Sequence, residues 1–280
     1  MKIINTIAGL KAALKPHRLK DQSIGFVPTM GALHPGHISL IDRARAENEV
    51  VVCSIFVNPT QFDNPDDQKK YPRTLEADCQ LLEPAGCDYV FAPSAEEMYP
   101  TLPKLTFDFG NLEHVMEGKF RDGHFNGVGI VVSKLFHIVN PDRAYFGQKD
   151  LQQVAVLRRM VNDLSFDLEL IPCPTLREKD GLAMSSRNTR LSAEARKIAP
   201  QLHAALQKAK DLLIQGKTAE ETQKEIDLFF KNIPEFRPEY FEIADFDDLE
   251  PIEKMKTEGK TAICTAAYLD GVRLIDNIVF

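Results

Sequence analysis

The chain has 280 residues, of which 44% are hydrophobic and 27% are charged, and its formal net charge is −7. These proportions indicate a globular protein with a sizeable core, no apolar run reaches the roughly 18 residues of a membrane span, and no basic stripe favours nucleic acid as a partner. The five cysteines include no CxxC pair, so we expect no disulfide framework or zinc site, and a reducing, cytoplasmic compartment.

Short apolar strands alternate with amphipathic helices through about the first 175 residues. The segment 49–58 (EVVVCSIFVN) is an almost continuous apolar strand, as expected when both faces of a sheet are covered. Repeated strand–helix units predict an α/β fold with a doubly wound parallel sheet, in which ligands bind beyond the carboxyl ends of the strands. The predicted strands are 23–28, 49–58, 88–92, 143–146 and 167–172, and the predicted helices are 38–46, 72–82, 127–139 and 151–164.

The pattern changes after about Thr175. A polar loop at 177–192 leads to helices predicted at 192–215 and 218–231 and to strand-like segments at 240–245, 261–268 and 272–275. Helices followed by antiparallel-looking strands predict a smaller α+β domain. We therefore divide the chain into domains 1–175 and 176–280, with the loop as a hinge and a substrate site between them.

The strongest motif is TMGALHPGH at 29–37, between a predicted strand and a predicted helix. Gly31 and Gly36 permit close backbone approach, and a helix N-terminus offers free N–H groups to a phosphate. His34 and His37 share a face in a helical turn, so two imidazole donors can stabilise charge that develops at an α-phosphorus. The alternatives are a metal site, for which no HExxH or third ligand is nearby, and structural histidines.

Two other segments fit phosphate chemistry. The loop 184–188 (MSSRN) combines hydroxyls with a guanidinium, which can close over a triphosphate and neutralise departing pyrophosphate. In the segment 147–150 (GQKD), Lys149 lies where a strand meets a helix and can reach phosphate, whereas Asp150 can simply cap the helix. Taken alone, the first segment is better explained as a solvated interdomain linker.

Polar residues in two other loops and in one predicted helix are weaker candidates. Asn58 and Gln61 follow the second strand, where amides are also common turn formers. Arg121 and His124 lie in a glycine-bearing loop that can act as a lid. Asp78 is either a helix-surface acid or a residue near a metal-bound phosphate.

Together these segments resemble the pantoate–β-alanine ligase family of the HxGH nucleotidyltransferase superfamily. The resemblance covers most of the first 190 residues in the right order and implies a Rossmann-like N-terminal domain, a small C-terminal lid domain and a homodimer. Small departures are Gln148 in place of the usual Glu, Leu176 in place of Val, and Ile130 after Gly129. The matching segments are PTMGALHPGH (28–37), FVNPTQF (56–62), YPRTLEAD (71–78), GVGIVVSKLFHIVNPDRAYFGQKDLQQ (127–153) and REKDGLAMSSRN (177–188).

The resemblance also implies a reaction. Pantoate and ATP, with Mg2+, give pantoyl-adenylate and pyrophosphate, and β-alanine then gives pantothenate and AMP. The implied catalytic residues are His37 as general acid, His34 as phosphate partner, Lys149 and Arg187. The implied ATP-binding residues are Met30, Gly31, Ala32, Leu33, His34, Pro35, Gly36, His37, Gly147, Gln148, Lys149, Asp150, Leu176, Met184, Ser185, Ser186 and Arg187.

For the acyl substrate, the resemblance implies that Gln61 and Gln153 hold pantoate and that Gln61 also meets β-alanine. Asn58 and Arg121 are further substrate-binding candidates, and Asp78 is the candidate metal ligand.

The sequence leaves three other functions to consider. Another nucleotidyltransferase would share the HxGH motif but need no acyl acceptor. A class I tRNA synthetase is disfavoured because the chain is short and acidic and has no evident anticodon-binding region. A non-catalytic nucleotide sensor is disfavoured because His34, His37, Lys149 and Arg187 suit the charge of a leaving group.

Overall fold

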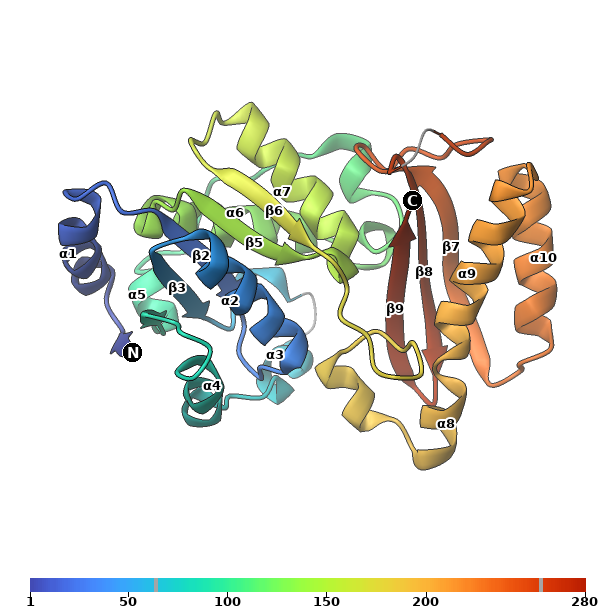
Figure 1. The fold of residues 1–280 in the computed structure, drawn as a ribbon, viewed down its shortest axis with the longest axis horizontal. Coiled ribbons are helices and arrows are strands. Elements are labelled where there is room, and N and C mark those ends of the chain that lie inside the picture. Colours follow the sequence, from blue (N-terminus) through green and yellow to red (C-terminus); the bar gives the residue numbers. More distant parts are fainter. Residues whose placement is uncertain (63–64, 257–258) are drawn as a thin grey trace.

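The computed structural model describes residues 1–62, 65–256 and 259–280. It contains a six-stranded parallel sheet with helices on both faces and a three-stranded antiparallel sheet at the C-terminal end of the chain (Figure 1). This arrangement confirms the predicted fold class, a Rossmann-like α/β unit with a smaller α+β unit. No helix among the described residues is long and apolar enough to cross a membrane.

The parallel sheet has the strand order β1-β4-β3-β2-β5-β6. Its strands are β1 (Lys2–Ile4), β2 (Ile24–Thr29), β3 (Val50–Ile55), β4 (Tyr89–Phe91), β5 (Arg143–Gly147) and β6 (Glu169–Cys173). Its helices are α1 (Ile7–Arg18), α2 (Pro35–Glu47), α3 (Pro65–Lys70), α4 (Leu75–Leu82), α5 (Ala95–Met98), α6 (His124–Val139) and α7 (Leu151–Asp163).

The order of the strands fixes the position of the site. From β2 the chain builds outward through β3 and β4, and it then returns to the other side of β2 to add β5 and β6. The order in which strands are added therefore reverses between β2 and β5, which pair directly and in parallel. Ligands bind at such a switch point, beyond the carboxyl ends of the strands, and these ends are Thr29 and Gly147.

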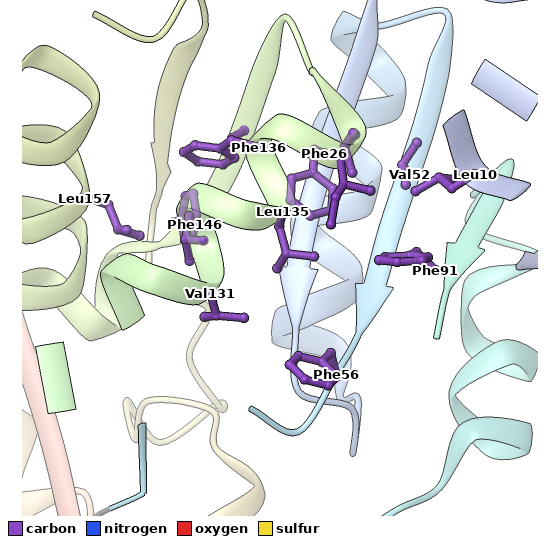
Figure 2. Close-up of a cluster of buried hydrophobic side chains, with 14 of the residues drawn as sticks. Leu10, Phe26, Val52, Phe56, Phe91, Val131, Leu135, Phe136, Phe146 and Leu157 are labelled. Carbon is purple, nitrogen blue, oxygen red and sulfur yellow. The ribbon is translucent and has the colours of Figure 1, made fainter. Parts of the chain in front are cut away.

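Both faces of the parallel sheet are buried because alternate residues of each strand point to opposite sides. Phe26 and Val52 face the cluster under α1, α6 and α7, and Val27 and Val51 face the cluster under α2 and α4. In the first cluster the ring of Phe136 meets that of Phe26 edge-on at a centroid distance of 6.4 Å (Figure 2). These clusters hold the ends of β2 and β5 in place.

The antiparallel sheet has the order β7-β8-β9 and is also covered on both faces. Ile263 and Ala267 of β8 face α9 and α10, whereas Ala262 and Cys264 face Leu151 at the start of α7. The second contact joins the two sheets. The elements are α8 (Ala193–Ile198), α9 (Gln201–Ile214), α10 (Ala219–Lys231), β7 (Phe236–Asp245), β8 (Thr261–Leu269) and β9 (Val272–Val279).

Several predicted boundaries were wrong. The single helix predicted over 192–215 is two helices, because Pro200 lies between α8 and α9. The helix predicted over 72–82 begins at Leu75, and the short helices α3 and α5 were not anticipated. The last strand continues beyond the predicted 275 to Val279, a difference that matters for the site.

Candidate functional site

A cavity of about 290 Å³ opens at the carboxyl ends of β2 and β5, with walls from α6, from the loop after β6 and from the loop before α8. The structure thus brings together residues that are far apart in the sequence. The predicted site residues that line it are Met30, His34, Gly36, His37, Asn58, Gln61, Arg121, Gly147, Lys149, Asp150, Gln153, Leu176, Met184, Ser185, Ser186 and Arg187. The predicted site residues outside the lining are Gly31, Ala32, Leu33, Pro35, Asp78 and Gln148.

His34 and His37 stand at the start of α2, and the backbone fixes how each ring is protonated. The N–H of Gly36 donates to His34 Nδ1 at 3.1 Å, and the N–H of His34 donates to His37 Nδ1 at 3.3 Å. A ring nitrogen that accepts a hydrogen bond carries no proton, so each neutral ring carries its proton on Nε2. Both rings can therefore offer an Nε2–H donor to a ligand in the cavity.

The surroundings favour these neutral forms. Burial, and then the neighbouring His34, lower the pKa of His37 to about 3. Burial and the charge of Lys149 also lower the pKa of His34. The ring centroids are 4.1 Å apart, so two imidazolium charges would repel each other. At pH 7 the ligand-free protein thus presents two uncharged N–H donors beside the Lys149 ammonium.

Asp78 lies behind the loop that leads to these histidines. Its side chain is only 2% exposed, and its oxygens accept from the N–H of Ala32 at 3.1 Å, from the N–H of Leu33 at 2.8 Å and from the Thr74 hydroxyl at 3.2 Å. Gly31 has a φ of +84°, and a Cβ there would lie 3.0 Å from Asp78 Oδ2. The carboxylate therefore holds the loop and is not part of the cavity lining.

Replacing Asp78 with asparagine is expected to loosen this loop, because an amide N–H would face a backbone N–H. Losing one hydrogen bond to a charged group costs about 1.5–3 kcal/mol of folding free energy. Chemical denaturation measures this loss, with the exposed Asp42→Asn on α2 as the matched control. A Mg2+ titration distinguishes the alternative: a metal ligand would raise the Mg2+ concentration for half-maximal activity and leave stability almost unchanged.

Asn58 and Gln61 follow β3 and form one hydrogen-bonded unit. Asn58 is 1% exposed, its Oδ1 accepts from the Thr60 N–H and the Tyr99 hydroxyl, and its Nδ2 donates to the Gly127 carbonyl and to Gln61 Oε1 at 3.0 Å. The backbone partners fix the orientation of the Asn58 amide, and Asn58 in turn fixes that of Gln61. Gln61 thus turns Nε2 toward the Met30 sulfur at 3.2 Å and toward the cavity.

Arg121 lies in the cavity wall, and a network that sequence reasoning missed holds it. It donates to Glu117 Oε1 at 2.7 Å and to His124 Nε2 at 3.1 Å, and His124 Nδ1 donates to the Gln61 carbonyl. Arg273 of β9 also contacts Glu117, at 3.4 Å. Burial alone would raise the pKa of Glu117, but Arg121 and Arg273 outweigh it and hold the pKa at about 2.

Part of the cavity lining is apolar. Val128, Val131 and Leu135 of α6 line it together with Phe56 and Phe146. Helix α6 lies close to the loop after β3. A Cβ at position 127 would be only 2.2 Å from the Thr60 carbonyl oxygen. The cavity lining therefore combines cationic and N–H-donating groups, at His34, His37, Lys149 and Arg187, with an apolar wall from α6 and the amides of Gln61 and Gln153.

Metal ligation by the protein has little support in the described part of the chain. No group of three His, Cys, Asp or Glu side chains there is arranged to hold a metal ion. The cavity itself offers donors suited to anions rather than a ring of carboxylates. A divalent cation at this site would have to be held largely by the ligand it accompanies.

The profile of the pantoate-beta-alanine ligase family matches residues 2–279. Among curated proteins, the chain is 51% identical over 277 residues to a pantothenate synthetase of Cytophaga hutchinsonii, with 99% of this chain and 98% of the relative covered. It is 50% identical over 280 residues to a pantothenate synthetase of Bacteroides fragilis, with 100% and 99% covered.

Solved structures agree in fold. Pantothenate synthetase from Thermus thermophilus superposes with a TM-score of 0.92 at 45% identity, covering 100% of this chain and 99% of that one. Pantoate-beta-alanine ligase from Francisella tularensis, complexed with β-γ ATP and β-alanine, superposes with a TM-score of 0.79 at 37% identity, covering 100% and 97%.

Proposed function

The chain belongs to the pantoate–β-alanine ligase family, and we propose that its cavity at the switch point is where ATP activates pantoate for transfer to β-alanine. The chain is an ATP-dependent ligase that condenses these two substrates. The observation that supports this use of the cavity best is the pair of neutral imidazoles, His34 and His37, each with Nδ1 occupied by a backbone N–H. Together with Lys149 they provide donors for the phosphates of ATP, and we call this part of the cavity its phosphate end.

In the first step a pantoate carboxylate oxygen attacks the α-phosphorus of ATP, and the bond to pyrophosphate breaks. Negative charge grows on the phosphoryl oxygens and on the leaving group. We place the Nε2–H donors of His34 and His37 against this charge, with Lys149 and Arg187 beside the departing pyrophosphate. We propose that His37, expected from the resemblance to be a general acid, acts in this step as a hydrogen-bond donor through Nε2–H, because the His34 N–H occupies its Nδ1 and burial lowers its pKa to about 3.

Loops around the cavity are proposed to make the remaining contacts with the nucleotide. The residues of segments 29–37 and 147–150 that line the cavity, together with Leu176 and Met184–Arg187, are proposed to provide backbone groups and hydroxyls to the nucleotide. Mg2+ is proposed to arrive with the triphosphate and to neutralise part of its charge. We assign Asp78 to holding the 29–37 loop, in place of the metal role suggested by the resemblance, because its oxygens already accept hydrogen bonds from that loop.

Pantoate is proposed to lie against the apolar wall that α6 contributes to the cavity. Its quaternary carbon carries two methyl groups, which suit the valines of α6, and its carboxylate and hydroxyls suit the amides of Gln61 and Gln153. A neutral amide holds the carboxylate without the strong ground-state pairing of a guanidinium, so the oxygen stays nucleophilic. Asn58 has all its polar atoms engaged within the protein, so we assign it to orienting Gln61.

In the second step the amine of β-alanine attacks the acyl carbon, loses a proton, and AMP leaves. A product assay with ATP, pantoate and β-alanine, omitting each in turn, tests the proposal. Without β-alanine we expect at most one equivalent of pyrophosphate per site. Continuous release of pyrophosphate without β-alanine, or release of ADP, would contradict an adenylate held for an amine.

The C-terminal unit is proposed to be a lid. The buried cluster beneath α9 and α10 includes only residues after 181, which supports domains divided near 175. Closure should shrink the radius of gyration in X-ray scattering when a non-hydrolysable ATP analogue binds, and an unchanged value would argue against it. A homodimer stays a proposal from the resemblance, which light scattering tests. A cytoplasmic location stays a proposal from the cysteine pattern, which cell fractionation tests.

A further inference from the structure

Strand β9 of the C-terminal sheet contacts the segment that carries Lys149. The side-chain Nδ2 of Asn277 donates to the carbonyl oxygen of Gln148 at 2.9 Å and to that of Lys149 at 2.8 Å. Asn277 is 3% exposed, so water does not compete for these bonds. Because both acceptors are carbonyl oxygens, the amide can have only one orientation. One side chain thus fixes two successive peptide groups at the end of β5.

The backbone of Asn277 is equally constrained. Its N–H donates to Asp276 Oδ1 at 2.8 Å, and its carbonyl accepts from Arg177 Nη2 at 3.1 Å. Arg177 also pairs with both oxygens of Asp276, at 2.7 and 3.0 Å. The amide therefore projects from a strand end that is itself anchored to the loop after β6. Because its backbone is anchored, the Asn277 side chain can fix the position of the groups that it contacts.

The orientation of Lys149 depends on these peptide groups. It lies in a single 3₁₀ turn, Gln148–Asp150, which has no side-chain cap of its own. The sheet fixes the chain that enters this turn from β5, and α7 fixes the chain that leaves it. The turn itself is held by Asn277, which contacts the carbonyls of Gln148 and Lys149. A rotation of these peptides would swing the long lysine side chain away from the phosphate end of the cavity.

We propose that Asn277 is a positioning residue for the ligase reaction, which acts by holding Lys149 in its catalytic orientation. The inference rests on the proposed role of Lys149 in the site. It assigns to the C-terminal sheet a part in building the phosphate end of the cavity, besides its proposed role as a lid. Displacements of about 1 Å at a reacting group can cost on the order of 100-fold in rate.

A double-mutant cycle tests the inference with steady-state kinetics on the full chain. Lys149→Ala alone is expected to lower kcat/KM for ATP by about 10²–10³. Asn277→Ala alone is expected to lower it by about 10–100-fold. In the Lys149→Ala background, Asn277→Ala should cost less than about threefold, because residues that act through one another are not additive. Thr265→Val is the matched control, since its buried hydroxyl donates to a carbonyl of β7.

The outcomes separate the two claims. If Lys149→Ala is nearly as active as the parent, the proposed role of Lys149 fails. If Lys149→Ala is impaired but Asn277→Ala costs the same factor in both backgrounds, or costs no more than Thr265→Val, the positioning role is overturned. Should Asn277→Ala fail to fold, as judged by its thermal melt, Asn277→Ser keeps one donor and carries the same cycle.

Discussion

Replacing His37 with alanine is expected to lower kcat by about 10²–10³ and to change the Kd for ATP only slightly. Removing one preorganised donor to a developing oxyanion has effects of this size in comparable sites. The donor is preorganised here because the His34 N–H holds His37 Nδ1 and leaves the proton on Nε2. Since the charge on the phosphoryl oxygens grows toward the transition state, the loss should appear mainly in kcat.

The measurement combines steady-state kinetics with calorimetric titration of ATP. His137→Ala is a suitable control, because His137 is an exposed residue of α6 whose ring contacts the Ser133 carbonyl and the Phe166 ring, neither of which belongs to the cavity lining. Near-normal turnover in His37→Ala would remove His37 from the reaction. A large rise in the Kd for ATP with an unchanged kcat would instead make it a ground-state binding residue.

The second large effect is expected at Gln61. Gln61→Ala should raise the KM for pantoate by about 10–150-fold, the equivalent of the roughly 1.5–3 kcal/mol of one hydrogen bond to a charged group. Gln61→Glu should do at least as much harm although it has the same shape. Asn58 donates to Oε1 and thereby directs Nε2 to the cavity, where a glutamate would place an oxygen against the pantoate carboxylate.

Kinetics with pantoate varied, paired with calorimetry for ATP, measures this effect, and Gln153→Ala should behave similarly. Gln207→Ala on the exposed face of α9 is the matched control. If Gln61→Ala and Gln153→Ala both keep the parent KM for pantoate, the acyl pocket lies elsewhere. If the KM for ATP rises equally, the two glutamines do not bind pantoate selectively.

The sequence predicted the fold class and most of the cavity because these depend on local pattern. Apolar strands such as 49–58 alternate with amphipathic helices, and the polar residues that follow strands meet at one edge of a parallel sheet. The motif 29–37 was found for the same reason. Its glycines, proline and two histidines lie within seven consecutive residues, so the sequence alone indicates their chemistry.

What escaped prediction depends on contacts between distant segments. The partners of Asp78 lie 45 and 46 residues away, at Leu33 and Ala32. Asn277 meets residues 128 and 129 positions earlier, and only the tertiary structure brings them together. Glu117 and Arg273 look like ordinary surface charges in the sequence, and their mutual burial becomes visible only when β9 packs beside the loop at 117–121. The neutral state of His37 likewise follows from burial.

The most direct test of the account is to follow oxygen through the reaction. Pantoate labelled with ¹⁸O in both carboxylate oxygens is incubated with ATP and β-alanine, and the products are analysed by mass spectrometry. If the carboxylate attacks the α-phosphorus, one labelled oxygen must leave with AMP and the other must stay in the amide carbonyl of pantothenate. Unlabelled AMP, or label found in inorganic phosphate alongside ADP, would contradict an acyl-adenylate formed at this site.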